Sequence, residues 1–176
     1  MSAAAAPAAA GIDIRPALKA DVPAIAAIWY DGWRQAHTGH VPEALLRFRS
    51  RETFDRRAGD RLDDAFVAAS NGVVAGFLRV HDDEIEQVFV AGSFQGTGLA
   101  RSLMQAGESL LSRRGIAIAF LVVNEANARA IRFYENCGWQ SAGLIDYAAE
   151  TGDGEMIIPV LRYEKTLHHS HSHEEF

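Results

Sequence analysis

The sequence predicts an α/β (α+β) fold: a mixed, mostly antiparallel sheet with helices on both faces. Three observations support this. Asn71-Gly72 joins two β-rich runs and is the strongest short signal for a hairpin. Residues 94–100, FQGTGLA, place two glycines between a strand-like run and an amphipathic helix. The run after that helix, IAIAFLVV (116–123), is continuously apolar, as expected of a strand that is covered on both faces.

The amino-terminal part predicts one short strand followed by two helices. The strand, IDIRPA, follows Gly11, and Asp21 is a good N-cap for the first helix. A break at HTGHVP precedes a second, more charged helix over residues 43–59. The first helix has an apolar stripe at i, i+3 and i+4 spacing, formed by Ile25, Ile28, Trp29, Trp33 and Ala36.

The middle of the chain predicts an antiparallel meander. The hairpin spans AFVAASNGVVAGFLRV (65–80), and the polar turn HDD leads into EIEQVFV (84–90). Side chains alternate along a strand, so Glu84 and Glu86 are expected to share one face with Val88 and Val90.

After the glycine loop the pattern alternates helix and strand. The helix after the loop carries Leu99, Leu103, Ala106 and Leu110 on one face and ends before Gly115. Because this helix forms a crossover, the strand 116–123 should lie parallel to the strand before the loop. The helix 125–138 follows, with Ala130, Phe133, Tyr134 and Cys137 on one face, and the strand-like runs 139–148 and 156–165 complete the domain.

Length and composition predict a single domain over residues 11–167. The alanine-rich residues 1–10 and the His-rich residues 168–176 are expected to be flexible tails, and no metal is expected. A net charge of −6 without a basic block argues against a nucleic-acid partner. No apolar run approaches the roughly 20 residues of a membrane helix. The only cysteine, Cys137, fits a reducing compartment, so we expect a cytoplasmic protein.

The glycine loop has the composition of an anion site. No Gly-Lys-Ser/Thr follows it, so it is not a P-loop, and Arg101 stands where a dinucleotide fingerprint needs its third glycine. What remains is Gln95-x-x-Gly98-x-Ala100, in which Gly96 and Gly98 free the amides of residues 96–101 at a helix N-terminus. These amides and the helix dipole can bind phosphate without a lysine.

This stretch resembles the pyrophosphate-binding motif of the GNAT superfamily of acetyl-CoA-dependent N-acetyltransferases, (Arg/Gln)-x-x-Gly-x-(Gly/Ala). A second stretch, LVVNEANARAIRFYENCGW, is similar to the family's later motif. The resemblance covers the element order from about Ile12 to Leu167 and is motif-specific from about Glu84 to Trp139. The positions that match the later motif are Asn127, Ala130, Tyr134, Glu135, Gly138 and Trp139.

The resemblance implies a site for acetyl-CoA between two splayed strands. Backbone groups of Val88, Phe89 and Val90 would bind the pantetheine arm, and the Asn127 side chain would hold it from the other wall, beside Ala130 and Tyr134. Thr97 departs from the basic residue that many members carry, so one charge on the phosphates is missing. The pyrophosphate would lie on the loop formed by Gln95, Gly96, Thr97, Gly98, Leu99, Ala100 and Arg101.

The resemblance also implies direct attack of an amine on the thioester. Tyr134 matches the family's tyrosine and is the candidate proton donor to the thiolate; a core role on the helix is the alternative. Glu84 or Glu86 is the candidate base, and solvated strand charges are the alternative. The acceptor pocket is expected to be shaped by Trp33, His37 and His40. The two histidines are also candidates for the base, weaker ones than the glutamates. Cys137 is interpreted as a structural thiol rather than an acyl carrier.

We therefore expect an N-acetyltransferase that acts on a primary amine of a small molecule or protein. A non-catalytic acyl-CoA-binding module, acting as a sensor or interaction protein, is the alternative. Tyr134 and the two glutamates favour the enzyme, because a binding module would not need them. The negative net charge weakly favours a cationic acceptor, and a homodimer is left open.

Overall fold

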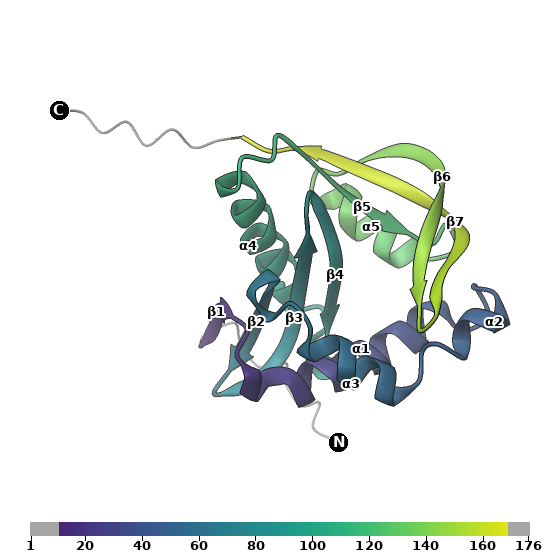
Figure 1. Cartoon of the computed structure of the whole chain (residues 1–176). Coiled ribbons are helices and arrows are strands. Elements are labelled where there is room, and N and C mark those ends of the chain that lie inside the picture. Colours follow the sequence, from purple (N-terminus) through teal and green to yellow (C-terminus); the bar gives the residue numbers. More distant parts are fainter. Residues whose placement is uncertain (1–10, 169–176) are drawn as a thin grey trace, which may run out of the picture.

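The computed structural model describes residues 11–168, which form one seven-stranded sheet (Figure 1). Its order is β1-β2-β3-β4-β5-β7-β6, and neighbours are antiparallel except for the parallel pair β4 and β5. The predicted sheet is confirmed. Its strands are β1 (Ile12–Pro16), β2 (Ala65–Ser70), β3 (Val73–His81), β4 (Glu84–Val90), β5 (Ile118–Val123), β6 (Gln140–Thr151) and β7 (Gly154–Thr166).

Helices cover both faces of this sheet, as predicted. On one face α4 packs against a core that includes Leu78, and on the other α1 packs against a core that includes its neighbour Phe77. The predicted tails, residues 1–10 and 169–176, lie outside the described residues; His168 is exposed. The helices are α1 (Val22–His37), α2 (Glu43–Leu46), α3 (Arg51–Gly59), α4 (Leu99–Arg113) and α5 (Ala128–Asn136), with 3-10 turns at Lys19–Asp21, Leu62–Asp64 and Gly92–Phe94.

The predicted hairpin between β2 and β3 is confirmed. Asn71 and Gly72 both have positive φ, 51° and 79°, as a tight turn between right-twisted strands requires. Ser70 consequently pairs with Val73 directly across the turn. On α4, Leu99 and Leu103 are buried as predicted, but the stripe continues through Gly107 and Leu111 rather than through Ala106 and Leu110, which are half-buried.

Two expectations for the first helices need correction. The predicted helix over 43–59 is two helices, because Ser50 has an extended backbone and its hydroxyl accepts from the Thr53 amide as a new N-cap. Asp21 occupies the N-cap position of α1, as predicted, but its side chain makes no capping hydrogen bond. Its carboxylate instead accepts from the Leu18 amide and forms an ion pair with Arg15 at 2.7 Å.

The strand β5 is parallel to β4, as predicted, but it is not covered on both faces. Ala119, Leu121 and Val123 are buried, whereas Phe120 and Val122 are only half-buried. The two strands share a single paired position, Glu84 with Phe120, and then separate. The open face of β5 therefore borders a space between the strands.

The last two strands form a long hairpin that reaches across the molecule. β7 lies between β5 and β6, so the hairpin extends the sheet beyond β5. Figure 1 shows it descending toward the end of α1 and α2. There, Arg57 of α3 lies 3.8 Å from Glu150 of β6. None of the helices in the described part of the chain has the length and apolar character needed to cross a bilayer.

Candidate active site

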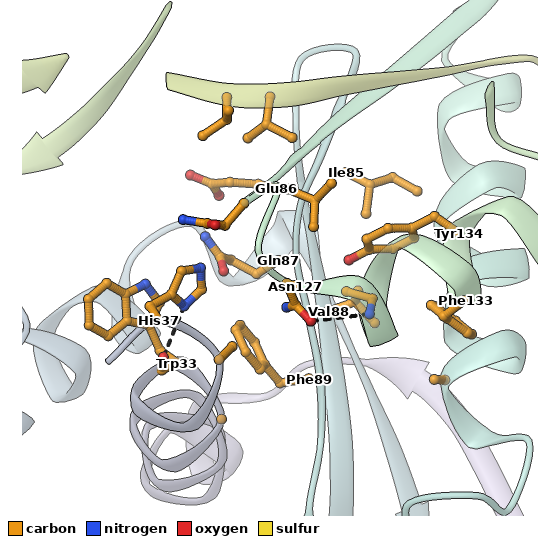
Figure 2. Close-up of a pocket in the computed structure, with 18 of the residues that line it drawn as sticks. Trp33, His37, Ile85, Glu86, Gln87, Val88, Phe89, Asn127, Phe133 and Tyr134 are labelled. Carbon is orange, nitrogen blue, oxygen red and sulfur yellow. Dashed lines mark hydrogen bonds between the residues drawn. The ribbon is translucent and has the colours of Figure 1, made fainter. Parts of the chain in front are cut away.

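A cavity of about 1260 Å³ runs from the glycine loop, between β4 and β5, to the β6–β7 hairpin. One end is lined by the loop and by α5, and the other by β4, α1, α3 and β6. Figure 2 shows Trp33 and His37 on one side of this space and Phe133 and Tyr134 on the other, with β4 between them. The cavity thus joins most of the residues that the sequence singles out.

The glycine loop has the geometry of an anion site. Gly96 and Gly98 have φ of 76° and 82°, and Gly98 is the N-cap of α4. The first helical hydrogen bond runs from the Ser102 amide to the Gly98 carbonyl, so the preceding amides of the first turn have no partner within the helix. Thr97 donates to the Phe94 carbonyl at 2.6 Å and stabilises the turn. Free amides and a helix N-terminus together favour a phosphate.

The opposite wall is α5. The Asn127 carboxamide oxygen caps this helix by accepting from the Ala130 amide at 3.2 Å, which leaves its amino group for a ligand. Tyr134 extends from α5 toward β4 with its hydroxyl directed into the cavity (Figure 2). Burial raises the pKa of Tyr134 to about 12, so the phenol is protonated at neutral pH. Cys137 is half-buried, and burial raises the pKa of its thiol, as a structural role requires.

A β-bulge in β4 corrects the predicted faces of this strand. Arg79 pairs with Gln87 and Val80 with Ile85, which leaves Glu86 as the extra residue. The alternation therefore shifts. Val88 and Val90 face the α4 core together with Ile85, whereas Phe89 packs in the α1 core. Glu84 and Glu86 do not share the Val88 and Val90 face.

One edge of β4 has backbone groups that pair with no neighbouring strand. On one edge Val88, Phe89 and Val90 pair with β3. On the other edge β5 has already separated, since its only described pair with β4 is at Glu84. An extended, amide-containing ligand can add to such an edge as another strand would.

Glu84 is the buried carboxyl of the cavity, with 6% of its surface exposed. The Tyr147 hydroxyl of β6 donates to it at 3.0 Å from Oε1. Burial raises the pKa of Glu84 to about 7, and the bond from Tyr147 opposes this rise. Sequence analysis missed Tyr147, because its nearness to Glu84 comes from the hairpin that crosses the cavity.

Glu86 has a different environment. Its Oε2 accepts from the buried Arg79 and from Arg61, both at 2.8 Å. Arg79 also donates to the Arg57 carbonyl and lies 4.5 Å from the Trp29 ring centre. Two guanidinium groups thus bind Oε2 of Glu86, which points to an anchoring role for this side chain.

The three predicted acceptor-pocket residues fall into two groups. Trp33 and His37 stack at 4.8 Å between ring centres and line the cavity. Burial lowers the pKa of His37, whose Nδ1 lies 2.9 Å from the Trp33 carbonyl. His40 is exposed and is not among the residues that line the cavity, so its role in the acceptor pocket stays a prediction. Only its backbone carbonyl contributes, by accepting from Asn124 at 2.8 Å.

Fold and site together define a class of protein with a glycine loop at a helix N-terminus and a cavity between two splayed parallel strands, a shape that suits an elongated, phosphate-ended molecule. The far end of that molecule would meet a carboxyl group with a pKa near 7. Residues 25–139 match the sequence model of the Acetyltransferase (GNAT) family. The chain belongs to this family, as the motif resemblance predicted.

Proteins that are similar to this chain are named as acetyltransferases or N-acetyltransferases. The chain is 33% identical over 131 residues to the [ribosomal protein bS18]-alanine N-acetyltransferase of Escherichia coli, covering 69% of this chain and 88% of that one. The chain is also 38% identical over 99 residues to a mycothiol acetyltransferase of Thermomonospora curvata. That match covers 53% of this chain but only 32% of the length of the relative. A Salmonella typhimurium putative acetyltransferase, yncA, solved with its cofactor acetyl-CoA, shares the fold with a TM-score of 0.67 at 22% identity, over 90% of this chain and 95% of that one.

Proposed function

We propose that the protein transfers the acetyl group of acetyl-CoA to a primary amine of a small molecule or protein. One observation carries this proposal: a single cavity joins the glycine loop at the N-terminus of α4 to a buried carboxyl, Glu84, whose pKa burial raises to about 7. The glycine loop would hold the pyrophosphate, and the free edge of β4 would hold the pantetheine amides. The Asn127 amino group would bind the same arm from α5. The likeness to a structure solved with acetyl-CoA supports this choice of donor.

The chemistry assigns different roles to two side chains. Glu84 takes a proton from the ammonium group of the acceptor, directly or through a water, which frees the lone pair on nitrogen. The nitrogen then bonds to the thioester carbon, the carbon–sulfur bond breaks, and Tyr134 donates its proton to the departing thiolate. The second proton of the attacking nitrogen passes through water to the Tyr134 phenolate, and Glu84 releases the first proton to solvent. A carboxyl of ordinary pKa near 4 is a poor base for an amine, so the raised pKa of Glu84 improves the match.

A screen of amines with thiol detection tests this function. The full chain is incubated with acetyl-CoA and a panel of amino acids, polyamines, aminoglycosides and peptide N-termini. At least one amine should release coenzyme A well above the hydrolysis rate and give an N-acetyl product by mass spectrometry. If acetyl-CoA raises the melting temperature but no amine across the panel is acetylated, a binding module explains the site better.

A further inference from the structure

The acceptor end of the cavity contains two buried cationic side chains. Arg49 and Arg57 both line it and are buried, with 5% and 7% of their surfaces exposed. The Nε atoms of both, together with Nε1 of Trp29, are the buried side-chain atoms without a hydrogen-bond partner within residues 11–168. All three are donors. Arg49 and Arg57 line the cavity, whereas Trp29 does not, so the two guanidinium groups are the donors that a ligand in the cavity could meet.

The two arginines also have few anionic groups near them in the described part of the chain. The nearest described carboxylate to Arg57 is Glu150, at 3.8 Å, which is too long for a hydrogen bond. Arg49 has no ion pair with a described residue and donates only to the Phe48 carbonyl, at 3.2 Å. Burial and the positive charge of Arg57 lower the pKa of Arg49 to about 10, so Arg49 stays cationic at neutral pH. Burial also lowers the pKa of Arg57. The negative charge of Glu150 opposes both effects, but its side chain is 62% exposed and therefore screened by solvent. Two buried like charges are costly unless an anion neutralises them.

Aromatic contacts do not supply that anion. The Arg57 guanidinium lies 4.7 Å from the Trp29 ring centre, and that of Arg49 lies 5.6 Å from the Trp33 ring centre. Such contacts orient a guanidinium and stabilise its charge, but they leave its N–H groups free. A planar group of donors held in this way matches the geometry of a carboxylate or phosphate.

These arginines lie at the same end of the cavity as the candidate base. Tyr147, whose hydroxyl donates to Glu84, lines the same cavity as Arg49 and Arg57. Tyr147 belongs to β6, as does Glu150, which lies 3.8 Å from Arg57. A ligand whose amine is near Glu84 would extend its other end toward Arg49 and Arg57.

We propose that the acceptor is an amine that also carries a compact oxyanion, a carboxylate or a phosphonate-like group, which Arg49 and Arg57 bind. This inference rests on the proposed function for the position of the amine, and it replaces the cationic acceptor that the net charge favoured. The local charge around the acceptor, not the net charge of the surface, decides which molecule fits.

Binding and turnover test it separately. Calorimetry in the presence of coenzyme A measures the dissociation constant of each amino acid in a panel and of its own carboxamide. The same measurement compares β-alanine with β-alaninamide and with 2-aminoethylphosphonate. We expect at least one oxyanion-bearing amine to bind about 10-fold or more tighter than its amide. Tighter binding of the phosphonate than of β-alanine would identify a tetrahedral oxyanion, and the reverse a carboxylate. Equal binding of every acid and its amide would overturn the inference.

Variants assign the preference to the two arginines. Arg49→Gln and Arg57→Gln should reduce the acid-over-amide preference to less than about 3-fold, and Arg49→Lys should keep part of it. The exposed neighbours provide matched controls, since Arg47→Gln and Arg56→Gln should keep the full preference. Should Arg57→Gln not fold, Arg49→Gln decides alone, with its acetyl-CoA thermal shift as the check on folding.

Different results would reject the proposed acetyltransferase function and the proposed oxyanion site. Acetylation of amides and acids at equal kcat/KM, with equal binding, would retain the proposed function and reject the oxyanion site. Preferential binding of acids without any acetylation would retain the oxyanion site and reject the proposed function. If both Gln variants keep the acid-over-amide preference but have a lowered melting temperature, Arg49 and Arg57 have only a structural role, through their contacts with the tryptophan rings.

Discussion

Tyr147 and Glu84, 63 positions apart in the chain, meet through a hydrogen bond of 3.0 Å that closes the acceptor end of the cavity. The phenol donates, so the bond favours the charged carboxylate and opposes the effect of burial on the pKa of Glu84. Because burial is the larger effect, Glu84 changes its charge close to neutral pH. The pH dependence of the protein should therefore depend on this pair.

Tyr147→Phe should move the acid limb of the pH–rate profile to higher pH. Without the hydroxyl, the carboxylate loses a stabilising donor, the pKa of Glu84 rises, and less base is present at pH 7. We expect kcat/KM to fall about 3- to 30-fold at pH 7 and to recover at pH 9. A profile displaced to lower pH, or not displaced, would show that the hydroxyl does not tune Glu84.

Glu84→Gln and Glu86→Gln should separate the two predicted bases. We expect Glu84→Gln to depress kcat/KM about 100-fold near neutral pH, with partial recovery at high pH where free amine is abundant. Glu86→Gln should keep the shape of the parent's pH–rate profile but destabilise the fold, because the buried Arg79 loses its charge partner. The measurement is a pH series on a confirmed acceptor, and reversed roles would contradict our assignment.

Glu84→Gln should also stabilise the protein at high pH. The pKa of Glu84 is about 7 in the folded chain against an ordinary 4.5, so ionisation costs more in the folded state than in the unfolded state. That cost is absent below about pH 4.5, grows as the pH rises to 7, and is complete above it. A shift of this size corresponds to a cost on the order of 3 kcal/mol.

Urea denaturation of parent and Glu84→Gln variant, at pH 4 and pH 8, measures this effect. The variant should exceed the parent in unfolding free energy at pH 8 and match it at pH 4. An equal difference at both pH values would mean that packing, and not ionisation, separates the two proteins.

Tyr134→Phe should separate chemistry from binding. The change keeps the ring in the cavity wall but removes the proton, so turnover should fall about 10- to 1000-fold. The acetyl-CoA-dependent rise in melting temperature should be unchanged, which controls for folding. Parental turnover in the variant would return Tyr134 to a purely structural role.

Gly98→Asp tests the phosphate loop. A Cβ at this position meets no atom within 4 Å, but φ is +82° and an added carboxylate would oppose a phosphate. The variant should lose the rise in melting temperature that acetyl-CoA gives the parent. Gly98→Asn is the matched control: Asn tolerates positive φ about as well as Asp, carries no charge, and should keep part of the shift.

The sequence by itself determined the order of elements, the Asn71-Gly72 hairpin and the glycine loop before α4. These depend on local rules: a positive-φ turn, the apolar period of a strand or helix, and the free amides of a helix N-terminus. Such rules act over a few residues, so they can be followed without a structure. The two family motifs, one with Gln95 and the other with Asn127, are each equally local.

Only the tertiary structure decided which side chains meet at the acceptor end. The bulge at Glu86 changed the face of Glu84, because one extra residue reverses the alternation of every residue before it. The β6–β7 hairpin carries Tyr147 to Glu84 and Glu150 to the Arg57 region because β7 lies between β5 and β6. Arg49 and Arg57 belong to a charged stretch that is typical of a solvated surface, and their burial follows only from the packing of α1 and α3 beneath that hairpin. Contacts between segments far apart in the chain depend on strand order and register, and no single stretch of sequence encodes these.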